Sequence, residues 1–590
     1  MRFAHFVLRE QHLARRFAEK VRYRLSRESG TVTKPHGGRV KFALAFPSTY
    51  YVGMSNLGLQ IIYRLLNNME DAVCERVFLP DPPDLLELET ARTPLFTLES
   101  QTPVQNFDVL AFSLSYEMDY PNVLKILSLS GVGLTSAERD DAQGFAPIVI
   151  AGGPAATFNP EPLANFIDVF VIGEAEPVLP EIVSVLSCSR GEPRPEVLKR
   201  LAAIEGVYVP SFYTPYYKPD GTLLCTKNAP GMPKKVKRRF EPDLKNYPSV
   251  SAIVTPETEF ADMILAEVAR GCGRHCRFCV AGHAYLPPRA RAEEDVIKDI
   301  ADMRKLVEER TGKAPRVGLL SASVFDHPSS LLICRSLIED ELHFSISSTR
   351  ADTLNEDIVA ALRSGGHQVI TIAPEAGTDR LRRIINKQIT GREVRQAARI
   401  AFEGGFRRVK LYFMLGLPTE GPEDVDAIRT LVEEIAVLHP WEKVIVSVSC
   451  FVPKPWTPFE WCGMKEERDL AKDMERLRSA FSRIKRVELL RESPREALVQ
   501  GVLARGDRRL AGVIEAVSKG MKWRQAWREG GIDPGFYATR ERPEDEVFPW
   551  DHIDLGISKK HLWHEYELGL AEASSAACVV GPCRRCGVCH

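Results

Sequence analysis

Apolar runs alternate with helical patterns along two long stretches of the chain. In the first stretch, residues 39–187, helical patterns such as residues 56–67 and 121–130 separate most of the apolar runs. The buried-strand candidates are residues 40–46, 72–79, 108–115, 146–152 and 168–173. Continuous apolar strands that alternate with helices predict a parallel, doubly wound, Rossmann-like sheet. Ligands of such sheets bind at the carboxyl ends of the strands.

The second stretch, residues 263–486, repeats the α/β rhythm six times. Its strand candidates are residues 263–269, 316–322, 343–348, 368–373, 408–415 and 443–449. Helical patterns follow these strands, for example at residues 293–309, 355–364 and 422–438. Six βα units predict a partial (β/α)6 barrel, because the closed form of this fold has eight. The expected fold class is therefore α/β.

Three further segments complete the predicted domain organisation. Residues 1–38 form a basic extension with a helix expected over about 8–25. Residues 188–262 are rich in Pro, Tyr and turn signals, with a hairpin cue at 218–221, and predict a β-rich connecting segment. Residues 487–590 predict a mainly helical C-terminal region that ends in a cysteine-rich tail.

The composition places no strong constraint on partners. The 78 basic and 79 acidic residues leave a net charge of −1, so any nucleic-acid contact has to be local. No signal peptide and no membrane-spanning run are visible, which predicts a cytoplasmic protein without a membrane partner. Thiols are kept reduced there, so the 13 cysteines are expected to be metal ligands or core residues rather than disulfides.

The strongest chemical motif follows the first strand of the second stretch. Cys272, Cys276 and Cys279 have the spacing Cys-x₃-Cys-x₂-Cys. A loop that leaves a strand can place three thiolates around one face of a [4Fe–4S] cluster, which leaves the fourth iron open for chemistry. Zinc more often takes paired Cys-x₂-Cys halves with four donors. A zinc knuckle or plain buried thiols are the alternatives.

With this triplet on this fold, the sequence resembles the radical S-adenosylmethionine (SAM) superfamily. The resemblance implies that the open iron chelates the amino and carboxylate groups of SAM. It further implies that one electron, from a donor of the flavodoxin or ferredoxin type, cleaves SAM to a 5′-deoxyadenosyl radical. The three cysteines are then the catalytic cluster ligands.

The same resemblance implies residues that bind SAM. Glu375 and Gly377 end the fourth strand of the second stretch and resemble the Glu-bearing element that holds the ribose or methionine part of SAM. Gly416 ends the fifth strand and resembles the segment that packs around adenine. Ser347 and Arg350 follow the third strand and are candidates for the SAM carboxylate, since Arg binds carboxylates bidentately.

A Rossmann-like sheet before a radical SAM barrel resembles the cobalamin-binding subclass. The resemblance implies that cobalamin lies against Ser113 and Ser115 after the third strand and against the Gly152-Gly153 turn after the fourth. Glycine at such a turn lets the backbone approach a ligand closely. A domain that lost the corrinoid, or that binds substrate or a partner instead, is the alternative.

One departure concerns the lower face of cobalamin. The Asp-x-His-x-x-Gly spacing of classical cobalamin proteins is matched around Tyr50 and Gly53, with Tyr in place of the ligating His. No histidine occurs between His36 and His275. If cobalamin binds, no histidine of this domain ligates its cobalt.

The C-terminal tail carries a second cysteine group: Cys578, Cys583, Cys586 and Cys589. Four thiolates can complete a tetrahedral zinc site or saturate an auxiliary iron–sulfur cluster. The spacing indicates a metal without identifying it, and a metal-free redox tail is the alternative.

The leading functional hypothesis is radical modification of a macromolecule, by cobalamin-assisted methylation at carbon. Similarity to tRNA- and ribosome-modifying radical SAM enzymes suggests RNA or ribosomal substrates, with the basic segments 234–239 and 380–383 as weak support. From residue 39 to its end, the chain also resembles a family of radical SAM proteins often encoded with a further small domain, which suggests a small companion protein. A radical SAM enzyme without cobalamin and a non-catalytic iron–sulfur scaffold or electron carrier are the alternatives.

Overall fold

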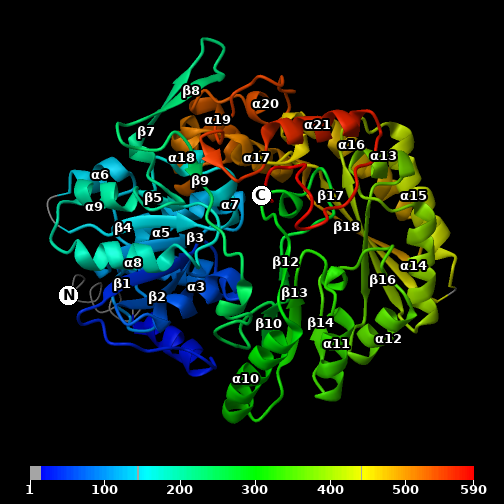
Figure 1. Ribbon diagram of the computed structural model, residues 1–590, viewed down its shortest axis with the longest axis horizontal. Helices are drawn as coiled ribbons and strands as arrows, with labels where there is room; N and C mark the ends of the chain where they lie inside the picture. The colour runs from blue at the N-terminus through cyan, green and yellow to red at the C-terminus, as the bar shows by residue number, and fades with distance from the viewer. Residues whose placement is uncertain (1–14, 143–144, 440, 590) are drawn as a thin grey trace, which may run out of the picture.

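The structure is a computed structural model that describes residues 15–142, 145–439 and 441–589. Figure 1 shows two α/β halves, the N-terminal half in blue to cyan and the second in green to yellow, with the C-terminal region above and between them. One hydrophobic core runs through both halves. Among the described residues, no helix is both long and apolar enough to cross a membrane.

The N-terminal half contains a six-stranded sheet of order β2-β1-β3-β4-β5-β6. The strands are β1 (Val40–Phe46), β2 (Ala72–Phe78), β3 (Val109–Ser113), β4 (Ile148–Gly152), β5 (Val169–Val171) and β6 (Val207–Tyr208). The first five are parallel, which confirms the predicted doubly wound sheet. The strand order reverses between β1 and β3, and ligands of open α/β sheets bind at such a switch point.

Two predicted helices of this half are found with small shifts. Helix α3 (Leu57–Asn68) begins after Asn56, whose side-chain oxygen accepts a hydrogen bond from the Leu59 N–H. Helix α5 (Tyr120–Leu129) carries Pro121 in its first turn, where proline costs no hydrogen bond. Residues 15–26 are helical, and the predicted start of that helix at about residue 8 lies outside the described residues.

The second half is an open barrel of parallel strands. One sheet contains β10 (Met263–Glu267), β13 (Arg316–Leu320) and β14 (Phe344–Ser345); the other contains β15 (Ile370–Glu375), β16 (Arg408–Leu415), β17 (Lys443–Cys450) and β18 (Val487–Arg491). A parallel bridge between Thr349 and Ile372 links the two sheets. Helices α10 (Glu293–Thr311), α11 (Ser330–Glu339), α12 (Glu356–Ser364), α14 (Gly391–Glu403) and α15 (Pro422–Ala436) form the outer layer, most visibly at the right of Figure 1.

The barrel has one strand more than the six that the sequence predicts. Strand β18 pairs in parallel with β17, so the barrel continues past residue 486, where the sequence analysis ended it. This strand lies at the edge of the sheet, and its burial alternates between half-buried and exposed positions. An edge strand therefore lacks the continuous apolar run that identified the other six.

The predicted connecting segment, residues 188–262, belongs partly to the N-terminal half and partly pairs with the C-terminal region. Helix α9 (Arg194–Leu201) and β6 belong to the first half, because β6 pairs antiparallel with β5 beyond the predicted boundary at 187. The predicted hairpin is present as β7 (Tyr213–Tyr217) and β8 (Leu223–Asn228). Strand β9 (Val236–Lys237) pairs with β19 (Ile553–Asp554) of the C-terminal region.

The C-terminal region joins the two halves. Helix α16 (Glu467–Phe481) connects β17 to β18 within the barrel. The C-terminal region contains α17 (Pro494–Arg505), α18 (Ala511–Ser518), α19 (Trp523–Glu529), α20 (Pro534–Tyr537) and α21 (Lys559–Leu570). The buried side-chain amide of Asn159 donates to the carbonyls of Ala504 and Gly506, at 3.1 and 2.8 Å. Arg508 pairs with buried Glu161 of the N-terminal half at 2.7 Å. These contacts fix the C-terminal region to the N-terminal half.

Candidate functional site

The three-cysteine loop leaves the barrel at the end of β10. Strand β10 leads into β11 (Ala269–Arg270), which pairs antiparallel with β12 (Arg289–Ala290) and so closes the loop at its base. Gly271 has a φ of +78°, and a Cβ atom there would lie 2.3 Å from the Tyr285 carbonyl oxygen. Only glycine permits this close return of the chain just before Cys272.

The structure brings the three predicted cluster ligands together. Burial raises the pKa of the Cys279 thiol to about 12, and the neighbouring thiols of Cys276 and Cys272 add to the effect. Burial also raises the pKa of Cys272, while Arg350 opposes the rise. Among the described residues, no three His, Cys, Asp or Glu side chains converge on one metal-ion position. A donor set of three thiols without carboxylates nevertheless fits an iron–sulfur cluster, in which each sulfur ligates a different iron.

A lysine that the sequence analysis missed lies beside these thiols. Lys387 Nζ is 2.8 Å from Oε1 of Glu375, the predicted SAM-binding carboxylate at the end of β15. Burial lowers the pKa of Lys387, but the negative charges of Glu375 and Cys276 raise it above its usual value. The loop carrying Lys387 is fixed to the cysteine loop by Asn386, whose amide donates to the His275 carbonyl at 3.1 Å.

The candidates after β14 have different environments. The Arg350 guanidinium is mostly buried and donates to both carboxylate oxygens of Asp352, at 2.9 and 3.1 Å, and to the Lys387 carbonyl at 3.0 Å. A SAM carboxylate at Arg350 would therefore compete with Asp352. Ser347 is exposed. Their roles in SAM binding stay predictions.

Close packing or a positive φ explains why glycine occupies both predicted positions in the barrel. A Cβ on Gly377 would lie 2.4 Å from the Asp424 carbonyl oxygen, because the first turn of α15 packs against the end of β15. Gly416 has a φ of +84°, and its N–H donates to the Glu420 carboxylate at 2.7 Å. These contacts shape the barrel mouth, and they leave the predicted SAM contacts untested.

Glu420 makes the stability of this mouth depend on pH. Burial raises its pKa to about 7, although the Gly416 N–H and Lys465 act in the opposite direction. Above pH 4.5 the folded protein therefore keeps the Glu420 carboxyl protonated, whereas the unfolded chain loses that proton. The free energy of unfolding consequently falls as the pH rises toward 7. Between pH 5.5 and 8 we expect the wild type to lose about 1–3 kcal/mol relative to Glu420→Gln, followed by urea unfolding. Exposed Glu434→Gln is the control, and parallel pH profiles for wild type and Glu420→Gln would contradict this assignment.

A cavity of about 480 Å³ lies between the two halves. Three predicted cobalamin-contact residues line it from the first sheet: Ser113, Ser115 and Gly153. Gly271 and Ala281 of the cysteine loop line it from the barrel. A Cβ on Gly153 would lie 2.6 Å from the Leu114 carbonyl oxygen, at a φ of +102°, so this turn requires glycine. Gly152 ends β4 beside this turn. The switch point of the first sheet thus faces the cluster loop across one cavity.

The other three predicted cobalamin residues, Gly152, Tyr50 and Gly53, are not among the residues that line this cavity. Tyr50 is buried, and its hydroxyl donates to Glu28 at 2.5 Å, a carboxylate that also pairs with Arg76. Burial raises the pKa of this hydroxyl above its usual value. A Cβ on Gly53 would lie 2.3 Å from the Phe78 ring. Helix α2 (Tyr50–Gly53) turns this motif into the core, so the spacing match reflects packing rather than a cavity-lining motif.

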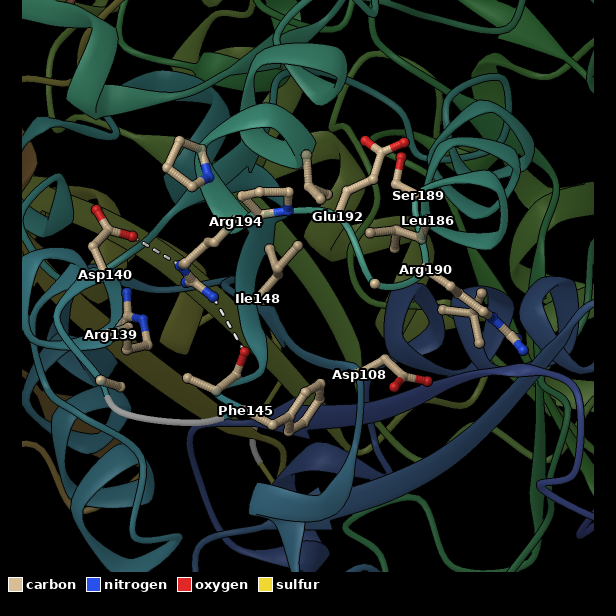
Figure 2. A pocket seen from close by; sticks show the side chains of 17 residues that line it. Asp108, Arg139, Asp140, Phe145, Ile148, Leu186, Ser189, Arg190, Glu192 and Arg194 are labelled. Carbon is tan, nitrogen blue, oxygen red and sulfur yellow. Dashed lines mark hydrogen bonds and ion pairs between the residues drawn. The ribbon is translucent and has the colours of Figure 1, made fainter.

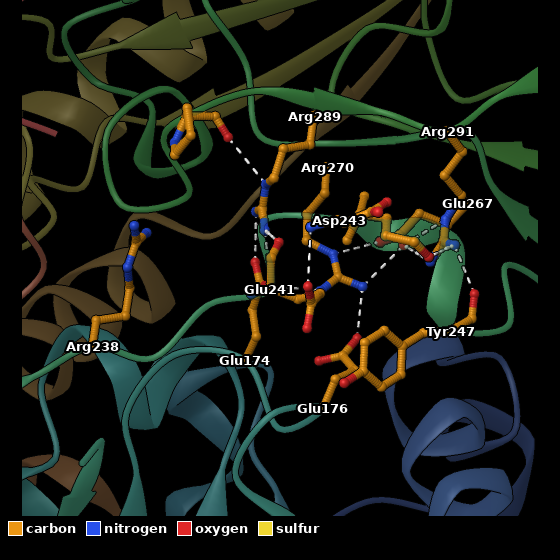
Figure 3. Close-up of polar contacts among 12 residues, drawn as sticks. Glu174, Glu176, Arg238, Glu241, Asp243, Tyr247, Glu267, Arg270, Arg289 and Arg291 are labelled. Atoms are coloured by element: carbon orange, nitrogen blue, oxygen red, sulfur yellow. Dashed lines mark hydrogen bonds and ion pairs between the residues drawn. The ribbon is translucent and has the colours of Figure 1, made fainter. Parts of the chain in front are cut away.

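Charged residues beside this cavity join the two halves, and Figure 3 shows the contacts among them. Arg270 pairs with Glu174, Glu176 and Glu267, at 2.9, 2.8 and 3.0 Å. Arg289 pairs with Glu174 at 2.6 Å. Because Glu174 and Glu176 follow β5, the network fixes the first sheet against the base of the cysteine loop.

A larger cavity of about 660 Å³ lies at the opposite end of the first sheet (Figure 2). Arg194 pairs there with Asp140, and Arg139 pairs with Asp168. The amino ends of the strands, including Val40 and Ile148, border this cavity. Because ligands of parallel sheets bind at the carboxyl ends, we assign the functional site to the cavity between the halves.

Three histidine rings lie behind the cysteine loop. The ring of His275 is 5.7 Å from that of His283 and 6.3 Å from that of His561 on α21. His283 Nδ1 lies 2.9 Å from the Cys279 carbonyl oxygen. His275 and His283 are buried, and His561 is half-buried, so the rings pack the cysteine loop against α21. The tail cysteines also return to this loop: the Cys578 N–H donates to the Gly273 carbonyl at 2.7 Å.

Comparison with known proteins identifies the class. Residues 266–432 match the model of the radical SAM superfamily, and residues 58–210 match that of the N-terminal domain of radical SAM proteins. The chain belongs to the radical SAM superfamily. It is a radical SAM enzyme, and enzymes of this superfamily use a [4Fe–4S] cluster, SAM and an electron donor.

Among curated proteins, the chain is 30% identical to the uncharacterized protein MJ0966 of Methanocaldococcus jannaschii, over 80% of this chain and 90% of that protein. It is 24% identical to the uncharacterized methyltransferase PH0819 of Pyrococcus horikoshii, over 53% of this chain and 67% of the relative. Among solved structures, it is similar to the cobalamin-dependent SAM radical enzyme OxsB with aqua-cobalamin bound. That likeness has a TM-score of 0.48 and 15% identity, over 67% of this chain and 52% of OxsB, and we draw no functional conclusion from it.

Proposed function

We propose that this radical SAM enzyme transfers a methyl group with cobalamin held in the cavity between its two halves. The observation that carries the proposal is this shared cavity, lined by Ser113 and Gly153 on one side and by Gly271 beside Cys272 on the other. The similarity to a protein named as a methyltransferase supports the same reaction type. Ser113, Gly153 and Gly271 place no bulky side chain in the part of the cavity where the two halves face each other.

The residues of this chain have distinct roles in that proposal. Cys272, Cys276 and Cys279 would hold the cluster, which when bound supplies the electron that cleaves SAM. Lys387 and Glu375 would orient SAM through its carboxylate and amino groups, because both charges lie beside the cysteine loop. Cobalamin would supply the methyl carrier. The Arg270 and Arg289 ion pairs would keep the two binding surfaces in register.

The distribution of basic residues gives little support to the prediction of an RNA or ribosomal substrate. Within segment 234–239, Arg238 is buried against the Leu286 carbonyl and Arg239 pairs with Glu181. Within segment 380–383, Arg380 pairs with Asp424 and Arg382 pairs with Asp379. The arginines of the two segments are engaged within the molecule, so the exposed basic charge comes mainly from Lys234, Lys235 and Lys237. A macromolecular substrate, and a small companion protein, stay predictions from the sequence resemblance.

A bulky substitution in the cavity wall tests the proposal. Ala322→Trp, on the barrel side of the cavity, is expected to abolish stoichiometric binding of hydroxocobalamin while the iron content stays at the wild-type level. Binding is measured by absorbance after gel filtration of the anaerobic protein. Leu332→Trp, at a residue of α11 whose exposed fraction is 51%, is the matched control. The cobalamin-loaded wild type should then form both 5′-deoxyadenosine and S-adenosylhomocysteine from SAM.

Each alternative has its own outcome. A wild type that binds no cobalamin but forms 5′-deoxyadenosine would favour a radical SAM enzyme whose first half binds substrate or a partner. A reconstituted protein that forms no 5′-deoxyadenosine under any condition would favour the iron–sulfur scaffold or electron carrier.

A further inference from the structure

The cysteine tail returns to the catalytic loop rather than extending into solvent. The Cys578 N–H donates to the carbonyl of Gly273 at 2.7 Å, and Gly273 follows the cluster ligand Cys272 directly. Figure 1 shows the end of the chain at the centre of the molecule, between its two halves. One hydrogen bond and two peptide units thus connect a tail cysteine with a cluster cysteine.

Several buried contacts fix this position. The Ser575 N–H donates to the Asn386 side chain at 3.0 Å, and Asn386 also holds the cysteine loop through the His275 carbonyl. Arg277, within the cysteine loop, donates to the Ser575 hydroxyl at 3.0 Å. The Ser558 N–H donates to the Cys586 carbonyl at 2.8 Å. The tail and the loop therefore form one packed unit.

The opposite side of the tail faces solvent. Val579 and Val580 are 64% and 52% exposed. Arg584 and Arg585 are exposed as well. An apolar tip beside two arginines suits a partner with an acidic surface. The same short segment thus has one end at the catalytic loop and the other at the surface.

We propose that Cys578, Cys583, Cys586 and Cys589 hold an auxiliary iron–sulfur cluster through which electrons enter the enzyme. A reduced, acidic one-electron carrier protein docks on the exposed tip and is oxidised by one electron. The auxiliary cluster is reduced and then reoxidised as that electron passes to the iron held by Cys272, Cys276 and Cys279. Four thiolates also suit zinc, but zinc has no redox chemistry and makes no use of a contact with the catalytic loop. This inference rests on the radical SAM class and is independent of cobalamin.

Removal of two tail ligands tests the proposal in the full-length protein. Cys583→Ser/Cys589→Ser leaves Cys578 and Cys586 in place, so the backbone contacts that dock the tail are retained. We expect iron to fall from about eight to about four per chain, with loss of one cluster from the Mössbauer spectrum. 5′-Deoxyadenosine formation should fall more than about tenfold with reduced flavodoxin as donor and stay near wild type with dithionite. Cys188→Ser, at an exposed cysteine outside both groups, is the control.

A charge reversal separates docking from cluster loss. Arg584→Glu should keep the wild-type iron content and lower the flavodoxin-driven rate about threefold to tenfold at low ionic strength. Stoichiometric zinc with only about four irons in the wild type would overturn the proposal. Equal slowing of the double variant with both reductants would also overturn it. If the wild type forms no 5′-deoxyadenosine even with dithionite, the radical SAM function itself fails, which is a separate result.

Discussion

Replacing Cys276 by alanine is expected to reduce 5′-deoxyadenosine formation to the background without SAM. Cys276 is the buried middle member of the three-cysteine loop. It is close enough to Cys272 and Cys279 for its negative charge to raise the pKa of both thiols. Two thiols cannot retain a cluster that leaves its fourth iron open for SAM. The measurement is an anaerobic assay of reconstituted protein with SAM and dithionite, with product quantified by chromatography and mass spectrometry.

Cys188→Ser serves as the matched control, because this exposed cysteine ends a helix far from the loop in sequence. It should keep both product formation and iron content. If Cys276→Ala forms 5′-deoxyadenosine at the wild-type rate, the three-cysteine loop is not the catalytic centre. Circular dichroism of both variants establishes that each retains the fold.

The second large effect is expected at Arg270, which joins the two halves. Replacing it by methionine leaves Glu174, Glu176 and Glu267 without their shared partner, and breaking a buried ion-pair network costs about 3–5 kcal/mol. The loss should appear in the first urea-unfolding transition. Arg395→Met removes a partly exposed pair with Glu434 and should cost less than about 1 kcal/mol.

The difference at Arg270 should also depend on pH. Burial raises the pKa of Glu174 and Glu267, but the neighbouring arginines more than offset this and hold both values below the usual 4.5. Their stabilising contribution is therefore present above pH 4.5 and is lost as the pH falls through their lower folded-state values. The difference in free energy of unfolding between wild type and Arg270→Met should therefore become smaller in that acid range. Equal losses in Arg270→Met and Arg395→Met would contradict the network's role.

The arrangement of both halves follows from local patterns. The buried strands β1 and β16 are continuous or alternating apolar runs, and their sequence limits were predicted to within a residue or less. The edge strand β18 was not predicted, because three of its five positions are exposed to solvent. A strand that is buried on both faces has a continuous apolar sequence and can be recognised from it. An edge strand has no such run, and its formation depends on the neighbouring strand with which it pairs.

The residues of the functional site, too, could be predicted from the sequence only in part. Cys272, Cys276 and Cys279 act within one loop, so their spacing alone indicated a cluster. Lys387 belongs to no motif, and only the fold brings it to Glu375 and the cysteine loop. Tyr50 matched a cobalamin-type spacing, yet its hydroxyl is directed to Glu28 in the core. A spacing match cannot specify which way a helix turns its side chains.

The sequence by itself determined the class of this protein, because a radical SAM loop and its parallel strands are specified by residues close together along the chain. Only the tertiary structure decided that the switch point of the first sheet faces the cluster loop across one cavity. It also decided that Cys578, some 300 residues further along the chain, docks beside Cys272. Both arrangements depend on long-range contacts, such as those of Arg270 and Asn386, whose partners no local pattern identifies.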